Sequence, residues 1–370
     1  MKSFLVLAFV IISIVFIQSC VDDPIDKKKD EITNSPFIPI IPEGFSSSDF
    51  FKNIPVDNPL TVKGVELGRM LFYDPILSKD GSISCNSCHH LNNSFSDNKK
   101  FSLGVNNTPG IINAMPLINL AWSSSFFWDG RATSLEQQAI EPILSVIEMH
   151  ETSANVIEKL KNHADYPNKF KNAFGGGEIT FERLTKALAQ FQRTLISGNS
   201  RWDVLLNAIK SSETLDSAFL KAGLNQNEIA GFQLFKTEQA ECFHCHDTHL
   251  GTSNLFEDNG LNENTDGTGH GAVTGNPNDD GKFKVPTLRN IRLTAPYMHD
   301  GRFKTLEEVV EFYSSDMKNS KNLNTFLQDD AQGSEGGLGL SPIQQKNLIA
   351  FLELFSDTTF VNNPAYKNPF

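Results

Sequence analysis

Two five-residue stretches, CNSCH at residues 85–89 and CFHCH at residues 242–246, share the pattern Cys-x-x-Cys-His. In each stretch, two thiols lie close enough to bond to the two vinyl groups of one haem, and the adjacent imidazole can reach its iron. The sequence therefore predicts two covalently attached haem c groups. The residues that attach and ligate them are Cys85, Cys88 and His89 for one haem, and Cys242, Cys245 and His246 for the other.

A Cys-x-x-Cys pair can also form half of a zinc site or a structural disulfide. A zinc ribbon does not require the His that follows both copies here, and a long segment separates the two copies. A disulfide across two residues would close a very small loop, which restricts the unfolded chain least. These points favour haem attachment over zinc and over disulfides.

The fifth cysteine, Cys20, ends an apolar N-terminal stretch that has Lys2 near its start. This organisation is typical of a secretory signal, and IQSC at residues 17–20 resembles a bacterial lipoprotein cleavage box. We expect residues 1–20 to be a signal peptide that leaves Cys20 lipidated, so that the protein is periplasmic and tethered to a membrane. The alternative is an uncleaved anchor, and both outcomes place the rest of the chain outside the cytoplasm.

Composition sets the remaining limits. The chain has 370 residues, which is long enough for two domains, and its net charge of −12 argues against nucleic-acid binding. The same charge is compatible with a basic electron-donor protein. Charged residues and three prolines predict that residues 21–45 form an extended, poorly packed tether. The membrane is then contacted only through the N-terminal lipid.

Helical patterns dominate the remainder, and signals for strands are few. We expect a mainly α fold of two cytochrome c-like helical domains, an N-terminal peroxidatic haem domain at residues 46–215 and a C-terminal electron-transfer haem domain at residues 216–370. Capping boxes at Thr305–Glu308 and Ser341–Gln344 mark two helix starts. Other expected helices cover residues 65–72, 135–147, 154–161, 181–195, 202–209 and 228–235.

Four further segments carry a specific resemblance. They are LGRMLFYDP at 67–75, FWDGRA at 127–132, Glu148-Met149, and APYMHDGR at 295–302. In order and spacing they resemble the bacterial dihaem cytochrome c peroxidase family, which includes the MauG-type enzymes, from about Pro55 to Asp357. The resemblance implies one haem that meets peroxide, with His89 as its ligand, and a second that relays electrons, with His246 as its ligand.

The resemblance also implies roles in the peroxide pocket. Cleavage of the O–O bond moves a proton between the two peroxide oxygens, so an acid/base is needed close to the iron. Glu148 matches the distal Glu of the family, although on composition alone it would be an ordinary exposed carboxylate. Gln138 and Pro142 match other residues of the same pocket. Trp128 matches the indole between the two haems, where an aromatic ring would couple them electronically.

A calcium ion between the domains is implied by positions that match Asn107, Thr294 and Pro296. Oxygen ligands of this kind, including backbone carbonyls, suit a hard cation.

The chain departs from many members of the family in two places. No His lies between His90 and His150, so the loop at residues 101–107 lacks the His that blocks the peroxidatic iron, and we expect that haem to be five-coordinate. His90 adjoins the proximal ligand and is a poor distal ligand.

The second departure concerns the other haem. Where ordinary peroxidases supply a Met ligand, 14 residues after the His of the Pro-Tyr-x-His segment, this chain has Tyr313, as in the MauG-type branch. The alternatives are that Met298 or Met317 ligates the iron and that Tyr313 is a core residue.

Two functions follow from the resemblance. The first is reduction of hydrogen peroxide to water with electrons from a small cytochrome or copper protein. The alternative is a MauG-like oxidase that uses a high-valent iron state to oxidise a partner protein or another substrate. A plain electron-transfer cytochrome is a third hypothesis, disfavoured because an open haem with a distal Glu has no purpose in a relay.

Overall fold

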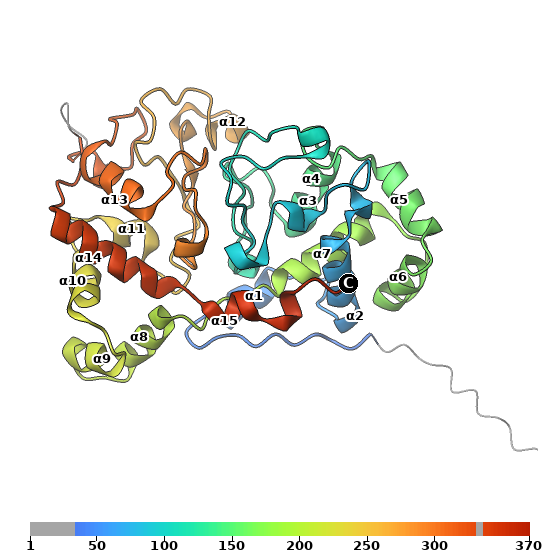
Figure 1. Ribbon diagram of the computed structural model, residues 1–370, viewed down its shortest axis with the longest axis horizontal. Coiled ribbons are helices and arrows are strands. Elements are labelled where there is room, and N and C mark those ends of the chain that lie inside the picture. The colour runs from blue at the N-terminus through green and yellow to red at the C-terminus, as the bar shows by residue number, and fades with distance from the viewer. Residues whose placement is uncertain (1–33, 331–335) are drawn as a thin grey trace, which may run out of the picture. The chain divides into compact units, whose positions relative to one another are not determined.

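Helices build most of the regular structure in the computed structural model, which describes residues 34–330 and 336–370 (Figure 1). The prediction of a mainly α fold is confirmed. The α-helices are α1 (Ser47–Lys52), α2 (Val62–Tyr73), α3 (Leu135–Gln138), α4 (Ile140–Leu144), α5 (Ser153–Asn162), α6 (Tyr166–Phe174), α7 (Phe181–Arg193), α8 (Arg201–Lys210), α9 (Leu215–Lys221), α10 (Gln226–Phe235), α11 (Cys242–His246), α12 (Gly271–Thr274), α13 (Leu306–Ser315), α14 (Pro342–Leu352) and α15 (Thr358–Asn362).

Short 3-10 helices and one small sheet complete the secondary structure of the described residues. The 3-10 helices are η1 (Pro75–Leu77), η2 (Cys85–Ser87), η3 (Leu91–Asn93), η4 (Val105–Asn107), η5 (Leu120–Trp122), η6 (Pro277–Asp279), η7 (Ile291–Leu293), η8 (Thr325–Leu327), η9 (Glu353–Phe355) and η10 (Pro364–Tyr366). Strands β1 (Phe256–Glu257) and β2 (Phe283–Lys284) pair antiparallel, with Phe256 opposite Lys284.

Two helix pairs, α2 with α7 and α10 with α14, cross closely at a glycine. Gly68 of α2 lies against the backbone of Ala187 in α7, so that a Cβ there would collide with the Ala187 carbonyl oxygen. Gly231 of α10 lies in the same way against Asn347 of α14. Each glycine starts the same pattern, Gly-x-x-Leu-Phe, and each helix precedes one Cys-x-x-Cys-His stretch. The same local construction is therefore used twice.

A separate hydrophobic core surrounds each helix pair. The first core is formed by buried side chains of α2, α5, α6 and α7, and Cys85 packs against it. The second is formed by buried side chains of α8, α10, α13 and α14, and Cys242 packs against it. Figure 1 shows these two groups of helices on opposite sides of the described unit. Each Cys-x-x-Cys-His stretch is thus seated on its own core.

The end of the chain returns to the first core. Phe360 and Tyr366 are buried there, and the Tyr73 hydroxyl donates a hydrogen bond to the Tyr366 carbonyl oxygen at 2.5 Å. The Tyr366 hydroxyl donates in turn to the carbonyl oxygen of Thr194 at 2.8 Å. The predicted division at residue 215 stays a prediction, but the last turns of the chain contact the core of the first half.

The predicted signal peptide, Cys20 and the first part of the tether lie outside the described residues. Residues 34–45 are described and are joined to the body, because Phe37 N donates to Leu60 O at 3.0 Å and Phe45 is buried. This part is thus anchored at Phe37 and Phe45, while Ile38 and Ile40 are exposed. Among the described residues, no helix combines the length and apolar character needed to cross a bilayer.

Most predicted helices form close to their expected bounds, but the helix expected at residues 135–147 does not. It is split into α3 and α4 at Ala139 and ends at Leu144. Pro142 has no backbone N–H and cannot donate a helical hydrogen bond to Gln138, which breaks the continuity. At α13, Thr305 caps the helix as expected, but Glu308 accepts from the backbone N–H of Lys304 rather than completing a capping box with Thr305.

Candidate haem sites

Each Cys-x-x-Cys-His stretch folds into one tight turn that gathers its thiols and imidazole. In the first, Cys88 N and His89 N both donate to Cys85 O, at 3.2 and 2.9 Å. The turn is fixed at its start because Ser84 N donates to the Ser87 hydroxyl at 3.0 Å. The second stretch forms the short helix α11. A compact turn holds the three donors of each motif in one place.

Both imidazoles are oriented by a backbone carbonyl. His89 Nδ1 lies 2.7 Å from Phe95 O, and His246 Nδ1 lies 2.8 Å from Gly251 O. With the proton on Nδ1, each ring donates to its carbonyl and leaves the lone pair of Nε2 for a metal. Desolvation by the surrounding protein lowers the pKa of both histidines. Neutral, oriented imidazoles of this kind are suited to ligate iron.

The four described cysteines have free thiols. They keep some accessible surface, yet protein atoms crowd around them, and this desolvation raises the pKa of Cys85 and of Cys242 to about 12 and that of Cys245 to about 11. The two pairs pack against different cores, so within the described residues they do not share one zinc site. The donor sets fit haem c.

A large cavity opens beside the second motif, with an empty volume of about 1600 Å³ that includes space open to solvent. Its wall includes Cys242, Cys245 and His246, together with many Leu and Val side chains. It also includes Tyr313 and Met298. Met317, in contrast, is buried in the second core and is not among the residues that line the cavity. Of the three candidate ligands, Tyr313 and Met298 therefore face the space next to the motif.

Tyr313 has a polar partner in this cavity. The side-chain amide of Asn259 donates a hydrogen bond of 2.9 Å to the Tyr313 hydroxyl oxygen, and it also lies 3.7 Å from the Met298 sulfur. Burial raises the pKa of Tyr313, while the Asn259 hydrogen bond acts in the opposite direction. Because Asn259 is the donor in this hydrogen bond, the phenol proton of Tyr313 is not held by it. A metal ion could therefore replace that proton on the phenol oxygen.

Glu148 acts electrostatically on the first motif. Desolvation is the main cause of the raised pKa of Cys85 and Cys88, and the Glu148 charge adds a smaller contribution at both thiols. The side chain is accessible to solvent, yet neighbouring protein raises its pKa by desolvation, and the nearby Arg131 partly offsets this. A carboxylate in this position can hold or release a proton near the first haem.

Gln138 and Pro142 lie on the short helices that lead to Glu148. The Pro142 carbonyl oxygen accepts from Met149 N at 3.1 Å, which fixes the residue that follows Glu148. Gln138 ends α3, and its backbone N donates to Ser134 O at 2.9 Å. Pro142 thus holds the backbone next to the carboxylate, while the contact of the Gln138 side chain with a substrate stays a prediction.

Trp128 forms part of the wall of the second cavity. Its indole Nε1 donates to Asn113 O at 2.9 Å, and its ring centroid lies 6.5 Å from that of His299. The side-chain amide of Asn113 donates to Lys99 O and Lys100 O, which lie in the segment that follows the first motif. Trp128 is therefore in contact both with the second cavity and with the segment that follows the first motif.

The loop at residues 101–107, which lacks a His, packs directly on Glu148. Val105 N donates to Glu148 O at 2.8 Å, and Gly104 approaches so closely that a Cβ would lie 2.6 Å from the same oxygen. His90 lies 4.0 Å from the buried carboxylate of Asp97. The loop supports the backbone of the proposed acid/base.

The predicted calcium residues are only partly brought together. Thr294 and Pro296 both line the second cavity, and the Thr294 hydroxyl donates to Ile291 O at 3.2 Å. Asn107 ends η4, and among the described residues no hydrogen bond joins it to Thr294 or Pro296. Calcium binding stays a prediction.

Three site residues were not found from the sequence. Lys284 is buried in the wall of the second cavity, where its ammonium donates to Ser123 Oγ and Ser125 O, and burial lowers its pKa to about 8. Asn259 and Gly104, described above, are the other two. Each owes its position to a contact between segments far apart in the sequence, and no local pattern indicates it.

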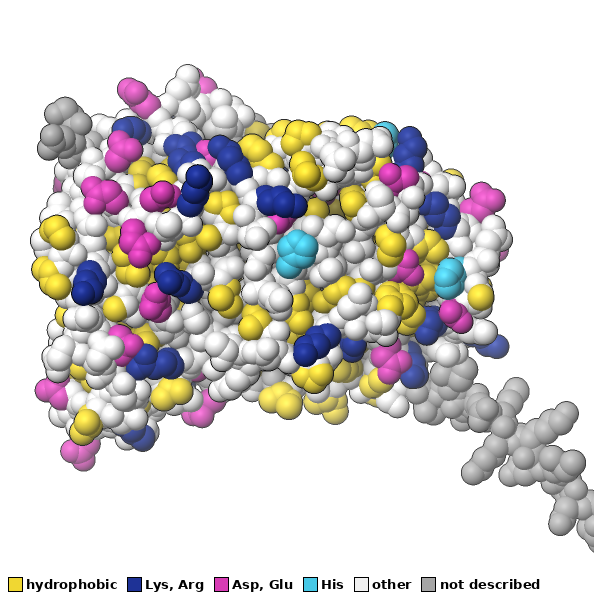
Figure 2. Space-filling view, in the orientation of Figure 1, with side chains coloured by type: hydrophobic (Ala, Val, Ile, Leu, Met, Phe, Trp, Pro, Cys, Tyr) yellow, Lys and Arg dark blue, Asp and Glu magenta, His cyan; other side chains and the backbone are white. Residues whose placement is uncertain are grey.

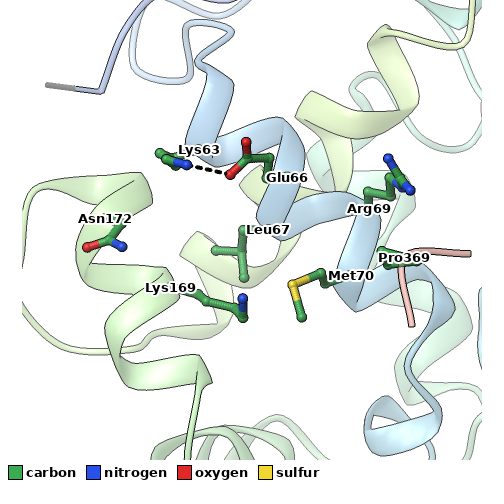
Figure 3. Close-up of a pocket in the computed structure, with 8 residues that line it drawn as sticks. All are labelled: Lys63, Glu66, Leu67, Arg69, Met70, Lys169, Asn172 and Pro369. Carbon is green, nitrogen blue, oxygen red and sulfur yellow. Dashed lines mark hydrogen bonds and ion pairs between the residues drawn. The ribbon is translucent and has the colours of Figure 1, made fainter. Parts of the chain in front are cut away.

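A second hollow lies between α2 and α6, away from the predicted site residues (Figure 3). Lys63 and Glu66 form an ion pair of 2.8 Å at its rim, and Arg69 and Lys169 also line it. Neither motif contributes to its wall.

Comparison with known proteins places these features in a wider group. Residues 62–211 match the family model described as di-haem cytochrome c peroxidase. The chain is 40% identical over 250 residues to cytochrome c551 peroxidase of Nitrosomonas europaea, covering 66% of this chain and 71% of the relative. It is 37% identical over 301 residues to the methylamine utilization protein MauG of Methylorubrum extorquens, covering 81% and 80%.

Solved structures share the fold. A MauG-like protein associated with microbial copper homeostasis superposes with a TM-score of 0.78 at 29% identity, covering 90% of this chain and 99% of that protein. The diheme peroxidase BthA from Burkholderia thailandensis gives a TM-score of 0.65 at 17% identity, over 83% of this chain and 90% of that one. At that identity the second likeness shows the fold alone.

Proposed function

Because the chain belongs to the di-haem cytochrome c peroxidase family, which includes MauG, it is an oxidoreductase with two haem c groups, and we propose that it reduces hydrogen peroxide to water. One peroxide takes up two electrons and two protons and gives two molecules of water. We propose that the electrons come from a small cytochrome or copper protein. The observation that carries this proposal is that the Glu148 carboxylate acts electrostatically on both thiols of the first motif.

Glu148 supplies the proton transfer in this proposal. Its carboxylate takes a proton from one peroxide oxygen and delivers it to the other, so that the leaving oxygen departs as water. The charge of Arg131 lowers the pKa of Glu148 and so partly offsets desolvation. Arg131 is itself held in place by an ion pair of 2.6 Å between its Nε and Glu141 Oε2. The haem iron, when bound, supplies the redox chemistry.

Electrons reach the first site from the second in this proposal, and Trp128 lies on the route between them. Its indole is held by the hydrogen bond to Asn113 O, and its ring forms part of the wall of the second cavity. A buried aromatic ring that is fixed in this way offers a π system between the two sites.

The charge of the chain bears on the electron donor. A net charge of −12 favours a basic partner. Figure 2 shows acidic and basic side chains interspersed across the face in view, so on that face the attraction comes from overall charge more than from one acidic patch. A donor recognised in this way would bind more weakly as ionic strength rises.

The test follows the stoichiometry. Purified holoprotein is mixed with hydrogen peroxide and a reduced small cytochrome, and donor oxidation is compared with peroxide loss. Two donor molecules oxidised for each peroxide support the proposal. If the donor is oxidised while the peroxide concentration stays constant, the result would instead support a plain electron-transfer cytochrome.

A MauG-like oxidase is the second candidate, and one observation favours it. Tyr313 faces the second cavity with Asn259 donating to its oxygen, an arrangement that suits a phenolate ligand. In this case peroxide would be consumed without oxidation of a small donor, and a partner protein or another substrate would be oxidised instead. Mass analysis of candidate partners after exposure to peroxide distinguishes the two functions.

We also propose that the protein is exported and lipidated at Cys20, on the evidence of the N-terminal sequence. Cys20→Ala should release the protein from the membrane fraction, and the wild-type N-terminal peptide should carry the mass of its lipid. Bound calcium, involving Asn107, Thr294 and Pro296, is proposed on the family resemblance. Metal analysis of the purified protein before and after treatment with chelator tests it.

A further inference from the structure

Three side chains at the start of the second motif converge on one point. His244, within the motif, places Nε2 3.1 Å from an oxygen of Glu238 and 3.0 Å from Oε2 of Glu241. The potential ligand atoms of all three residues lie within 4.8 Å of one another. None of the three side chains attaches a haem or acts in the proposed peroxide reaction, although Glu241 and His244 belong to the wall of the second cavity.

Glu241 is the unusual member of this cluster. Its side chain is only 8% exposed, and its Oε2 atom has no hydrogen-bond donor, although it points to His244. The imidazole N–H of His244 can serve one acceptor, and Glu238 already accepts it. A buried carboxylate oxygen without a donor is costly, because the charge has lost its hydration. The local structure therefore leaves one oxygen in need of a positive partner.

Negative charge also predominates around Glu241. Burial is the first cause of the raised pKa of Glu241, and the neighbouring Glu238 charge is the second. The charges of Glu238 and Asp330 both raise the pKa of Glu241, and His244 is the opposing group. A protonated imidazole alone would leave the cluster negative, whereas a divalent cation would balance it.

The spacing of the donors suits a metal ion. Protein ligands bind Zn²⁺ with bonds of about 2.0–2.2 Å, which puts adjacent donor atoms about 2.8–3.6 Å apart for angles between a right angle and a tetrahedral one. The separations of 3.0 and 3.1 Å from His244 Nε2 fall in this range. The imidazole is also held in place, because its ring stacks on Phe326 at a centroid distance of 3.7 Å and an angle of 4°.

We propose that Glu238, Glu241 and His244 form a binding site for a divalent transition-metal ion of the Zn²⁺ or Cu²⁺ type, separate from the haem irons. One imidazole and two carboxylates favour these ions over Ca²⁺ and Mg²⁺, which prefer oxygen ligands alone. Glu238 is 76% exposed, so the site is open to solvent on that side and water can complete the coordination.

Metal titration of the holoprotein tests this site. The full protein, with both haems attached, is freed of loose metal with a chelator and titrated with Zn²⁺ by calorimetry, and with Cu²⁺ by electron paramagnetic resonance. We expect binding that is weakened roughly tenfold or more in Glu241→Gln and in His244→Gln, since even groups that only support a metal ligand often matter that much. Millimolar Ca²⁺ should not compete.

Two further variants keep the test decisive. Glu238→Gln alters an exposed side chain, so it should keep the fold and still weaken binding, whatever happens to the variants of buried residues. His163→Ala is the matched control, because His163 is a half-buried histidine next to a carboxylate residue, Asp165, on a distant turn. Equal haem content in all variants shows that the second motif is intact. Affinity unchanged in Glu238→Gln and Glu241→Gln, or lowered equally in His163→Ala, would mean an adventitious ion only and overturn the proposal.

Discussion

The backbone nitrogen of Val105 donates a 2.8 Å hydrogen bond to the carbonyl oxygen of Glu148. This bond joins the loop that follows the first haem motif to the residue proposed to move the proton. Gly104 makes the approach possible, since a Cβ at that position would collide with the Ile147 carbonyl oxygen. The loop therefore sets the position of Glu148, in a chain whose loop has no His to cover the iron.

Gly104→Ala should displace the backbone of Glu148 and slow the reaction with peroxide. A shift on the order of 1 Å in a reacting group can cost about 100-fold in rate, so we expect a loss of at least roughly tenfold. Stopped-flow mixing of the diferric protein with peroxide measures it. Gly110→Ala, just after this loop, is the control, because its Cβ would come no closer than 3.4 Å to Ser102 O. Equal rates in the two variants would contradict this account.

Glu148→Gln should keep both haems attached and slow peroxide cleavage by roughly 100-fold or more, the scale of a positioned acid/base. The wild-type rate should fall on acidification, because the deprotonated carboxylate is needed to accept the first proton. Since desolvation raises the pKa of Glu148, this fall should begin at a higher pH than for an ordinary Glu. The variant should lack that step. Glu158→Gln, on an exposed face of α5, should behave as wild type in both respects.

The sequence predicts those parts of the site that are local in the chain. Cys85 and Cys88 are brought together by a single turn, so their spacing alone is informative. Asn259 and Lys284 reach the second cavity only because distant segments pack together, and no pattern of period 2 or 3.6 marks them. The break at Ala139 was missed because the apolar pattern continues through it, while Pro142 interrupts the hydrogen bonds.

Lys284 should make the folded protein more stable as the pH rises through the alkaline range. Burial lowers its pKa from the ordinary lysine value of 10.5 to about 8, so between these values the unfolded chain binds more protons than the folded one. Stability therefore rises with pH through this window, because ∂ΔG/∂pH follows that difference in bound protons. Denaturant unfolding at pH 7 and 9.5 should show wild type gaining up to about 2 kcal/mol relative to Lys284→Met. A constant difference between the two proteins would show that Lys284 does not titrate in this range.

Tyr313 and Met298 both face the space beside the second motif, and spectroscopy separates them as ligands. The Asn259 amide donates to the Tyr313 oxygen and so favours its ionised form over the protonated one. We therefore expect that the diferric wild type lacks the weak near-infrared band of sulfur-to-iron charge transfer, and that Tyr313→Met gains it. An anionic oxygen ligand stabilises the oxidised iron, so Tyr313→Met should also raise the reduction potential of the second haem.

Asn259→Leu tests the same arrangement without touching the ligand. Loss of the donated hydrogen bond should make the phenolate harder to form. Acidification should therefore detach the ligand at a higher pH than in the wild type, and the spectrum of the second haem should report this change. Met317→Leu is the control, because Met317 is buried in the second core and does not line the cavity. A sulfur band in the unmodified protein that disappears in Met298→Leu would assign the ligand to Met298. The chain would then join the peroxidases with a methionine ligand, and the case for a MauG-like oxidase would lose its main support.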